Sequence, residues 1–229
     1  MDIADFLSLI AAVILFVGWH VLVSGTTLRD HLVRRIGANA YRGLFSLAVL
    51  ILLAWIIVAY RHAPYVPLWG MPTWAGWLAV CLMPVAIILV VASLRPDNPT
   101  GGARPDQFDP RRAGIFAITR HPMMWGIGLW ATLHLLANGD VASVILFAGL
   151  GGLALGGTLS IDAKKRRHDQ AQWDILTATT SNLPFAALAD GRARLAPAAL
   201  LRPLVIGLVV YGVIGVLHSR VFDLALPIF

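Results

Sequence analysis

Residues 120–140 have the sequence RHPMMWGIGLWATLHLLANGD, an apolar segment with an Arg-His-Pro triplet at its start and a second histidine, His134, inside it. Proline is well placed in the first turn of a helix, so we expect the spanning part of this helix to begin near Pro122. Ionisable residues are costly within a membrane and usually have a functional reason to be there. The stretch therefore predicts a membrane helix that carries a candidate site.

The composition of the whole chain is that of a membrane protein. Of its 229 residues 58% are hydrophobic, the mean hydropathy is +0.76, and only 13% are charged, against roughly 25% in soluble domains. The net charge of +6 follows the usual excess of basic residues in cytoplasmic loops. Because the sequence carries no nucleic-acid-binding motif, we expect the lipid bilayer as a partner and no nucleic acid.

Six apolar runs are long enough to cross, or nearly cross, a hydrocarbon core that takes about 20 helical residues. They lie roughly at 6–23, 44–60, 74–94, 113–137, 141–161 and 204–217. The runs are continuous and lack the alternation of barrel strands, so only helices are expected. The sequence predicts an all-α integral membrane bundle of about six transmembrane helices, in a single domain over residues 1–229.

Basic residues gather in three of the segments that connect these runs. They are Arg29, Arg34, Arg35, Arg42, Arg95, Arg104, Arg111, Arg112, Lys164, Lys165, Arg166, Arg167, Arg192, Arg194 and Arg202. The positive-inside rule makes these segments cytoplasmic, including a basic segment at about 162–202, and places both termini in the periplasm of a bacterial inner membrane. The turn Asn138-Gly139-Asp140 predicts that the fourth and fifth runs form an antiparallel hairpin.

Arg120 and His121 are expected at the cytoplasmic end of the fourth helix, where the positive end of the helix dipole adds to their charge. Such a position attracts an anion: a phosphate, a carboxylate or a haem propionate. The alternative is that Arg120 extends to the lipid headgroups. The first interpretation makes both residues candidates for cofactor binding.

Three further histidines are embedded in apolar sequence, namely His20, His134 and His218. Neutral imidazole is a common ligand for iron, and two rings from facing helices can hold a haem. For His20, a hydrogen bond to a neighbouring helix is an equal alternative. The sequence has one cysteine, Cys81, and no CxxCH motif for covalent haem attachment.

The segment RHPMMWGIGLWATLHLLANGD, together with YRGLFSLAVL at 41–50 and FVGWHVLVSGTTLR at 16–29, resembles the NnrU family of bacterial membrane proteins. That family is related to 15-cis-zeta-carotene isomerase. The resemblance implies haem b and the redox-dependent cis-trans isomerisation of a carotenoid or similar polyene. It also implies that His20 and His134 are the haem ligands. Ala131 stands where the isomerases have a cysteine implicated in a ligand switch.

The expected depths of these histidines conflict with that pairing. The first helix runs inward and the fourth runs outward, so His20 should lie near the cytoplasm and His134 nearer the outside. Two axial ligands of one haem need similar depths. Either one helix is displaced or tilted, or His134 pairs with His218 instead, or no haem is bound by both residues of a pair.

Two other functions are open on the sequence. Since NnrU proteins are associated with denitrification and nitric-oxide metabolism, the resemblance also implies a non-enzymatic membrane accessory or sensor protein. The Arg-His-Pro triplet followed by Trp125 and Gly126 resembles membrane methyltransferases, but these use glutamates to hold their cofactor and this chain has none. The sequence assigns no catalytic residue, redox partner or oligomeric state.

Overall fold

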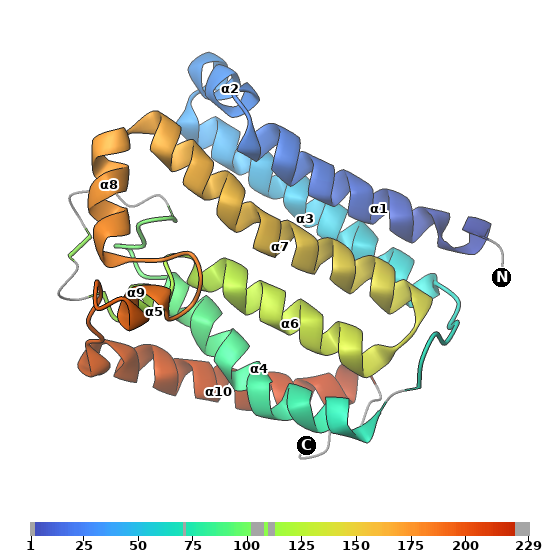
Figure 1. Cartoon of the computed structure of the whole chain (residues 1–229). Coiled ribbons are helices and arrows are strands. Elements are labelled where there is room, and N and C mark those ends of the chain that lie inside the picture. Colours follow the sequence, from blue (N-terminus) through green and yellow to red (C-terminus); the bar gives the residue numbers. More distant parts are fainter. Residues whose placement is uncertain (1–2, 71, 102–107, 110–112, 223–229) are drawn as a thin grey trace.

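The computed structural model describes residues 3–70, 72–101, 108–109 and 113–222, and the regular elements in this part of the chain are helices. The predicted all-α bundle is confirmed (Figure 1). The first span comprises η1 (Ile3–Phe6), α1 (Leu7–Gly18) and the π-helical η2 (Trp19–Ser24). The other long helices are α3 (Ala38–His62), α4 (Thr73–Ser93), α6 (Pro122–Asn138), α7 (Val141–His168) and α10 (Pro197–Phe222). Short helices connect them: α2 (Leu28–Ile36), α5 (Ile115–Ile118), α8 (Gln170–Thr179) and α9 (Ala186–Ala189).

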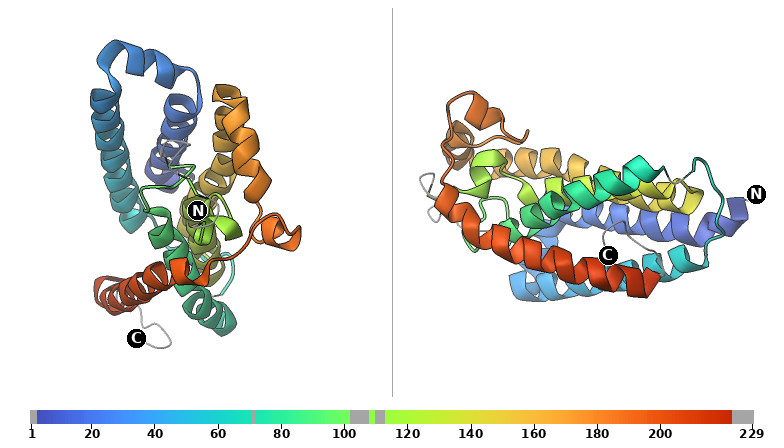
Figure 2. Two further views of the ribbon diagram at one scale, coloured as in Figure 1. Left: turned by 90° about the vertical axis from the view of Figure 1, so that its left-hand side faces the viewer. Right: turned by 90° about the horizontal axis from the view of Figure 1, so that it is seen from below.

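Neighbouring long helices follow a curved row in the order α3, α1, α7, α6, α4, α10 (Figure 2). Five spans in the described part of the chain are long and apolar enough to cross a membrane, and α6, with 17 residues, is shorter. Within α6 only Thr132 is exposed. The short helix is therefore an inner element of the bundle, and its neighbours carry most of the surface that faces lipid.

The fourth apolar run is not one helix, which corrects the expected run at 113–137. The chain forms the single turn α5, then passes through extended backbone at Thr119 (φ −153°, ψ 144°), and enters α6 at Pro122. The residue before a proline is disfavoured in the helical region, and His121 has φ −119° and ψ 52°. The predicted helix start near Pro122 is confirmed.

The predicted hairpin between α6 and α7 is also confirmed. Gly139 has a φ of +68°, which a glycine adopts without the penalty that a side chain brings, and Asp140 accepts a hydrogen bond from the Ser143 N–H as the N-cap of α7. Glycines let α6 approach its neighbours closely. A Cβ at Gly126 would lie 2.7 Å from the Ala86 carbonyl oxygen of α4.

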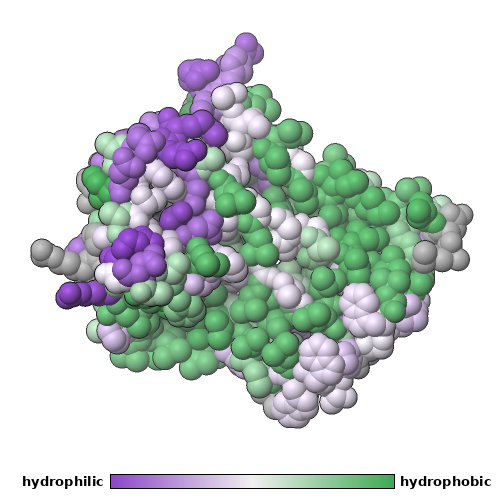
Figure 3. Space-filling model, in the orientation of Figure 1, coloured by the Kyte–Doolittle hydropathy of each residue, from purple (hydrophilic) through white to green (hydrophobic). Residues whose placement is uncertain are grey.

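The surface of the bundle divides into an apolar body and a hydrophilic end (Figure 3). Large apolar side chains such as Leu50 and Val209, 62% and 61% exposed, cover the outside of the helices. The hydrophilic end includes α2, α8 and the end of α7 (Figures 1 and 3). At the opposite end lie the start of α1 and the end of α10 (Figure 1). Arg104, Arg111 and Arg112 lie outside the described residues.

Candidate functional site

The Arg-His-Pro triplet contacts a carboxylate from the same chain. Arg120 donates from Nε to Asp162 Oδ1 (2.9 Å) and from Nη2 to Asp162 Oδ2 (2.5 Å), while His121 Nε2 lies 2.7 Å from Asp162 Oδ1. Asp162 comes from the last part of α7, so one carboxylate joins the start of α6 to the end of α7. Paired and hydrogen-bonded charges of this kind are the form in which proteins tolerate burial of charge.

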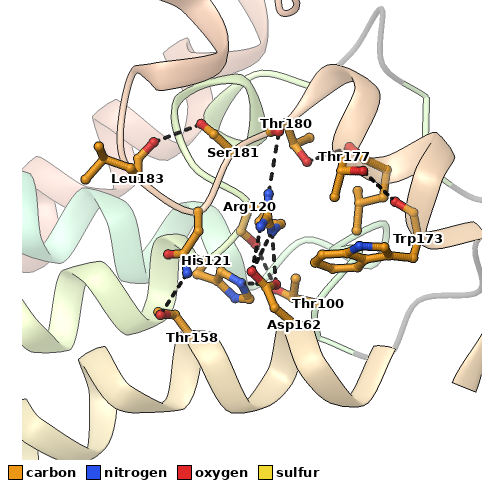
Figure 4. A network of polar contacts seen from close by, with 12 residues as sticks. Thr100, Arg120, His121, Thr158, Asp162, Trp173, Thr177, Thr180, Ser181 and Leu183 are labelled. Atoms are coloured by element: carbon orange, nitrogen blue, oxygen red, sulfur yellow. Dashed lines mark hydrogen bonds and ion pairs between the residues drawn. The ribbon is translucent and has the colours of Figure 1, made fainter. Parts of the chain in front are cut away.

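The cluster is enclosed by backbone and aromatic groups (Figure 4). The Arg120 N–H donates to the Ser181 carbonyl (2.8 Å), and the Thr100 hydroxyl donates to the Arg120 carbonyl (2.8 Å). The guanidinium carbon lies 4.9 Å from the centre of the Trp173 ring. Since Arg120 is 8% and His121 1% exposed, neither side chain extends to the lipid headgroups.

This arrangement changes the expectation of an external anion. Asp162 supplies the carboxylate that the positive end of α6 was expected to attract from a ligand. Asp162 is not among the residues predicted from the sequence, although an acid at the end of an apolar helix, two residues before a run of basic residues, was a usable signal. The triplet is thus joined to its own chain, and no other candidate residue lies in the cluster.

Asn182 holds the loop that covers the cluster. Its carbonyl accepts hydrogen bonds from the Thr119 hydroxyl (2.7 Å) and from Trp125 Nε1 (2.9 Å), and its side-chain Nδ2 donates to the Thr158 hydroxyl (3.0 Å). Beside this loop is an open depression of 570 Å³. Its lining comprises Arg120, Asp174, Thr177, Ala178, Thr180, Ser181, Asn182 and Arg192.

His134 lies near the other end of α6 in an aromatic environment. Its ring stacks on Phe147 (centroids 4.9 Å apart) and contacts Trp130 (5.0 Å). Its Nδ1 is 2.9 Å from the Trp130 carbonyl oxygen. A carbonyl only accepts, so Nδ1 carries the proton and, in the neutral ring, Nε2 has the free lone pair.

The structure brings His134 together with His218 of α10. The centroids of the two rings are 6.4 Å apart, with 50° between their planes. Two imidazoles bound to one metal through bonds of about 2 Å would have centroids roughly 6 Å apart. The pair therefore has the spacing of two axial ligands, and its members come from different helices.

The structure does not bring His134 together with His20. The His20 Nδ1 donates to the Phe16 carbonyl (2.8 Å), and its ring lies against Phe16 and Phe45, with centroids 4.5 and 5.4 Å away. Helices α1 and α7 run in parallel, with Val13 beside Gly149 and Gly25 beside Ser160. Phe147, the ring on which His134 stacks, is therefore level with a residue of α1 about nine positions before His20. The His134 and His20 rings are thus separated by about 13 Å along the bundle axis.

These placements limit which histidines could share one haem. Among the described residues there is no group of three or more His, Cys, Asp or Glu side chains that could hold a metal ion directly. A haem supplies four nitrogens of its own and needs only axial ligands. The neighbouring rings of His134 and His218 are close enough to be considered as such a pair, whereas His20 lies too far along the bundle from His134.

Comparison with known proteins gives the family. The NnrU protein family model matches residues 8–225. The chain is 37% identical over 82 residues to 15-cis-zeta-carotene isomerase of Zea mays and 33% identical over 79 residues to that of Arabidopsis thaliana. These matches cover 36% and 34% of this chain but only 22% of each relative, and no solved structure matches. Because the family model spans nearly the whole chain, the protein belongs to the NnrU family.

Proposed function

We propose that this NnrU protein catalyses the cis-trans isomerisation of a double bond in a carotenoid or similar polyene within the bilayer. The similarity to proteins named 15-cis-zeta-carotene isomerase supports this reaction class. The bundle supports the substrate class, because its outer surface is apolar and a polyene partitions into lipid.

The observation that carries the proposal is the pair of facing imidazoles in an apolar bundle. We propose that His134 and His218 hold a haem b, which when bound supplies an iron that can change its redox state. The chain itself fixes the His134 ring. The Trp130 carbonyl sets its tautomer, and Phe147 sets its plane.

The cluster at the start of α6 positions this histidine. His134 lies three helical turns beyond the triplet, and Arg120, His121 and Asp162 join that end of α6 to α7. In this proposal Arg120 and His121 act through the helix and do not contact the substrate. Asp162 is then a positioning residue as well.

The test starts with protein expressed with added haem and purified in mild detergent. We expect a Soret band and a pyridine haemochrome of type b, and, after reduction, conversion of a cis-configured carotene measured by chromatography. Haem without conversion would overturn the enzymatic proposal and favour a sensor or accessory role in nitric-oxide metabolism. Absence of haem would remove the cofactor assignment.

The ligands are tested by substitution. We expect His134→Ala and His218→Ala each to abolish the Soret band, and His20→Ala to retain it. Helical circular dichroism of each variant controls for folding. If His20→Ala loses the band while His218→Ala keeps it, the facing pair is not the ligand pair and His20 takes the place of His218.

A further inference from the structure

Helix α2 is amphipathic, and the two ends of its apolar side, at Leu28 and Ile36, are not covered by protein. In the sequence LRDHLVRRI the apolar positions Leu28, Leu32, Val33 and Ile36 fall on one side of a helix. Leu28 and Ile36 are each 43% exposed, and none of the nine residues is buried. A helix of this kind that lies at the end of membrane-spanning helices is suited to the plane of the interface.

Two of the three arginines of α2 have no acidic partner among the residues that the structure describes. Arg29 is paired with Asp30 (3.1 Å), but Arg34 and Arg35 form no ion pair with any described residue. The same holds, within the part of the chain that the structure describes, for Arg166 and Arg167 at the end of α7. Four unneutralised guanidinium groups therefore lie at the hydrophilic end of the bundle.

The two sets of arginines are held near one another by contacts between η2 and α7. The Lys164 ammonium donates to the Ser24 carbonyl (2.9 Å), and Gly25 lies against Ser160. Figure 1 shows α2 and the end of α7 at the same end of the bundle, and Figure 3 shows hydrophilic residues gathered there above the apolar body.

We propose that α2 is an interfacial helix and that Arg34 and Arg35, with the basic end of α7, bind the phosphate groups of anionic phospholipids. The helices that α2 connects end at this level, which is where headgroup phosphates lie. The cations match the charge of an anionic leaflet. Lipid also accounts for Leu28 and Ile36, because acyl chains cover apolar side chains that a soluble acidic partner would leave in water.

The test measures amide hydrogen exchange in α2 for the full chain in two kinds of nanodisc, one of phosphatidylcholine and one of equal parts phosphatidylcholine and phosphatidylglycerol. We expect slower exchange of the α2 amides in the anionic discs. The exchange rate in phosphatidylcholine discs divided by the rate in anionic discs measures this protection. This ratio should fall roughly fivefold in R34Q and roughly fivefold again in the double variant R34Q/R35Q. Equal rates in the two discs would overturn the proposal.

Two controls make the result specific. R61Q alters an arginine at the opposite end of α3, and its ratio of exchange rates should equal that of the unaltered protein. Unchanged exchange in α6 shows that each variant is folded. Inorganic phosphate added to the phosphatidylcholine discs should not slow exchange in α2. If it does so as strongly as phosphatidylglycerol, the ligand is a free anion and the membrane assignment is wrong.

Discussion

At the scale of single residues, Asp162 of α7 binds Arg120 and His121, which lie far from it in the sequence. It lies 2.5 Å from Arg120 Nη2 and 2.7 Å from His121 Nε2, and the Arg120 and Asp162 side chains are only 10% and 14% exposed. Removing one member of a buried ion pair leaves the other charge without compensation. The contribution of Asp162 is therefore mainly to avoid that cost.

We expect Asp162→Ala to lower the free energy of unfolding by about 3–5 kcal/mol, because Arg120 would remain buried without an anion. Unfolding in mixed detergent micelles, followed by circular dichroism, measures this loss. The matched control is Asp30→Asn, since the Arg29–Asp30 pair is 40% and 52% exposed and should contribute less than about 1 kcal/mol. Equal effects of the two changes would contradict the assignment of a buried pair.

At the scale of elements, the contact between α6 and α4 depends on a glycine. Gly126 faces the backbone of Ala86, which cannot move aside as a flexible side chain can. Gly152 in α7 has no atom within 4 Å of the position a Cβ would take. Gly152 is thus an open position of α7, whereas Gly126 is a point of close approach between α6 and α4.

We predict opposite effects of alanine at these two glycines. Gly126→Ala should destabilise the protein by about 1–3 kcal/mol, because the added methyl group forces α6 and α4 apart. Gly152→Ala should be neutral or stabilise by up to about 1 kcal/mol, because alanine favours the helix. Unfolding of both variants in the same micelles gives the comparison. A loss of stability only at Gly152 would be inconsistent with the packing of α6 on α4.

Elements with local signals were predictable from the sequence. Pro122 marked the start of α6, and Asn138-Gly139-Asp140 marked the hairpin, because backbone preferences at these residues depend on neighbours in the chain. The pairing of His134 with His218, left open by the sequence, involves two rings that the structure brings within 6.4 Å of each other. The link between His121 and Asp162, and the loop held by Asn182, depend on tertiary contacts across dozens of residues. No local pattern encodes such contacts.

At the scale of the whole molecule, the charge distribution predicts an orientation. The exposed residues Tyr65 and Trp74 lie at one end of α3 and α4, as expected for aromatic side chains at a membrane interface. The arginines of α2 lie at the other end. The positive-inside rule assigns the arginine-rich end to the cytoplasm.

Single-cysteine labelling tests that orientation. In a Cys81→Ser background, Tyr65→Cys should react with a membrane-impermeant maleimide in intact spheroplasts, because that end should face the periplasm. Arg35→Cys should react only after the cells are lysed. The reverse labelling pattern would show that the orientation predicted from charge is wrong.

The shortness and enclosure of α6 have a consequence for the response to membrane thickness. Hydrophobic mismatch acts on helices that contact lipid, by tilting them or by deforming the bilayer around them. Since Thr132 is the one exposed residue of α6, this helix is largely shielded from such forces by α4 and α7. In bilayers of shorter or longer acyl chains, we expect the outer helices to change tilt while the distance between His134 and Asp162 stays constant.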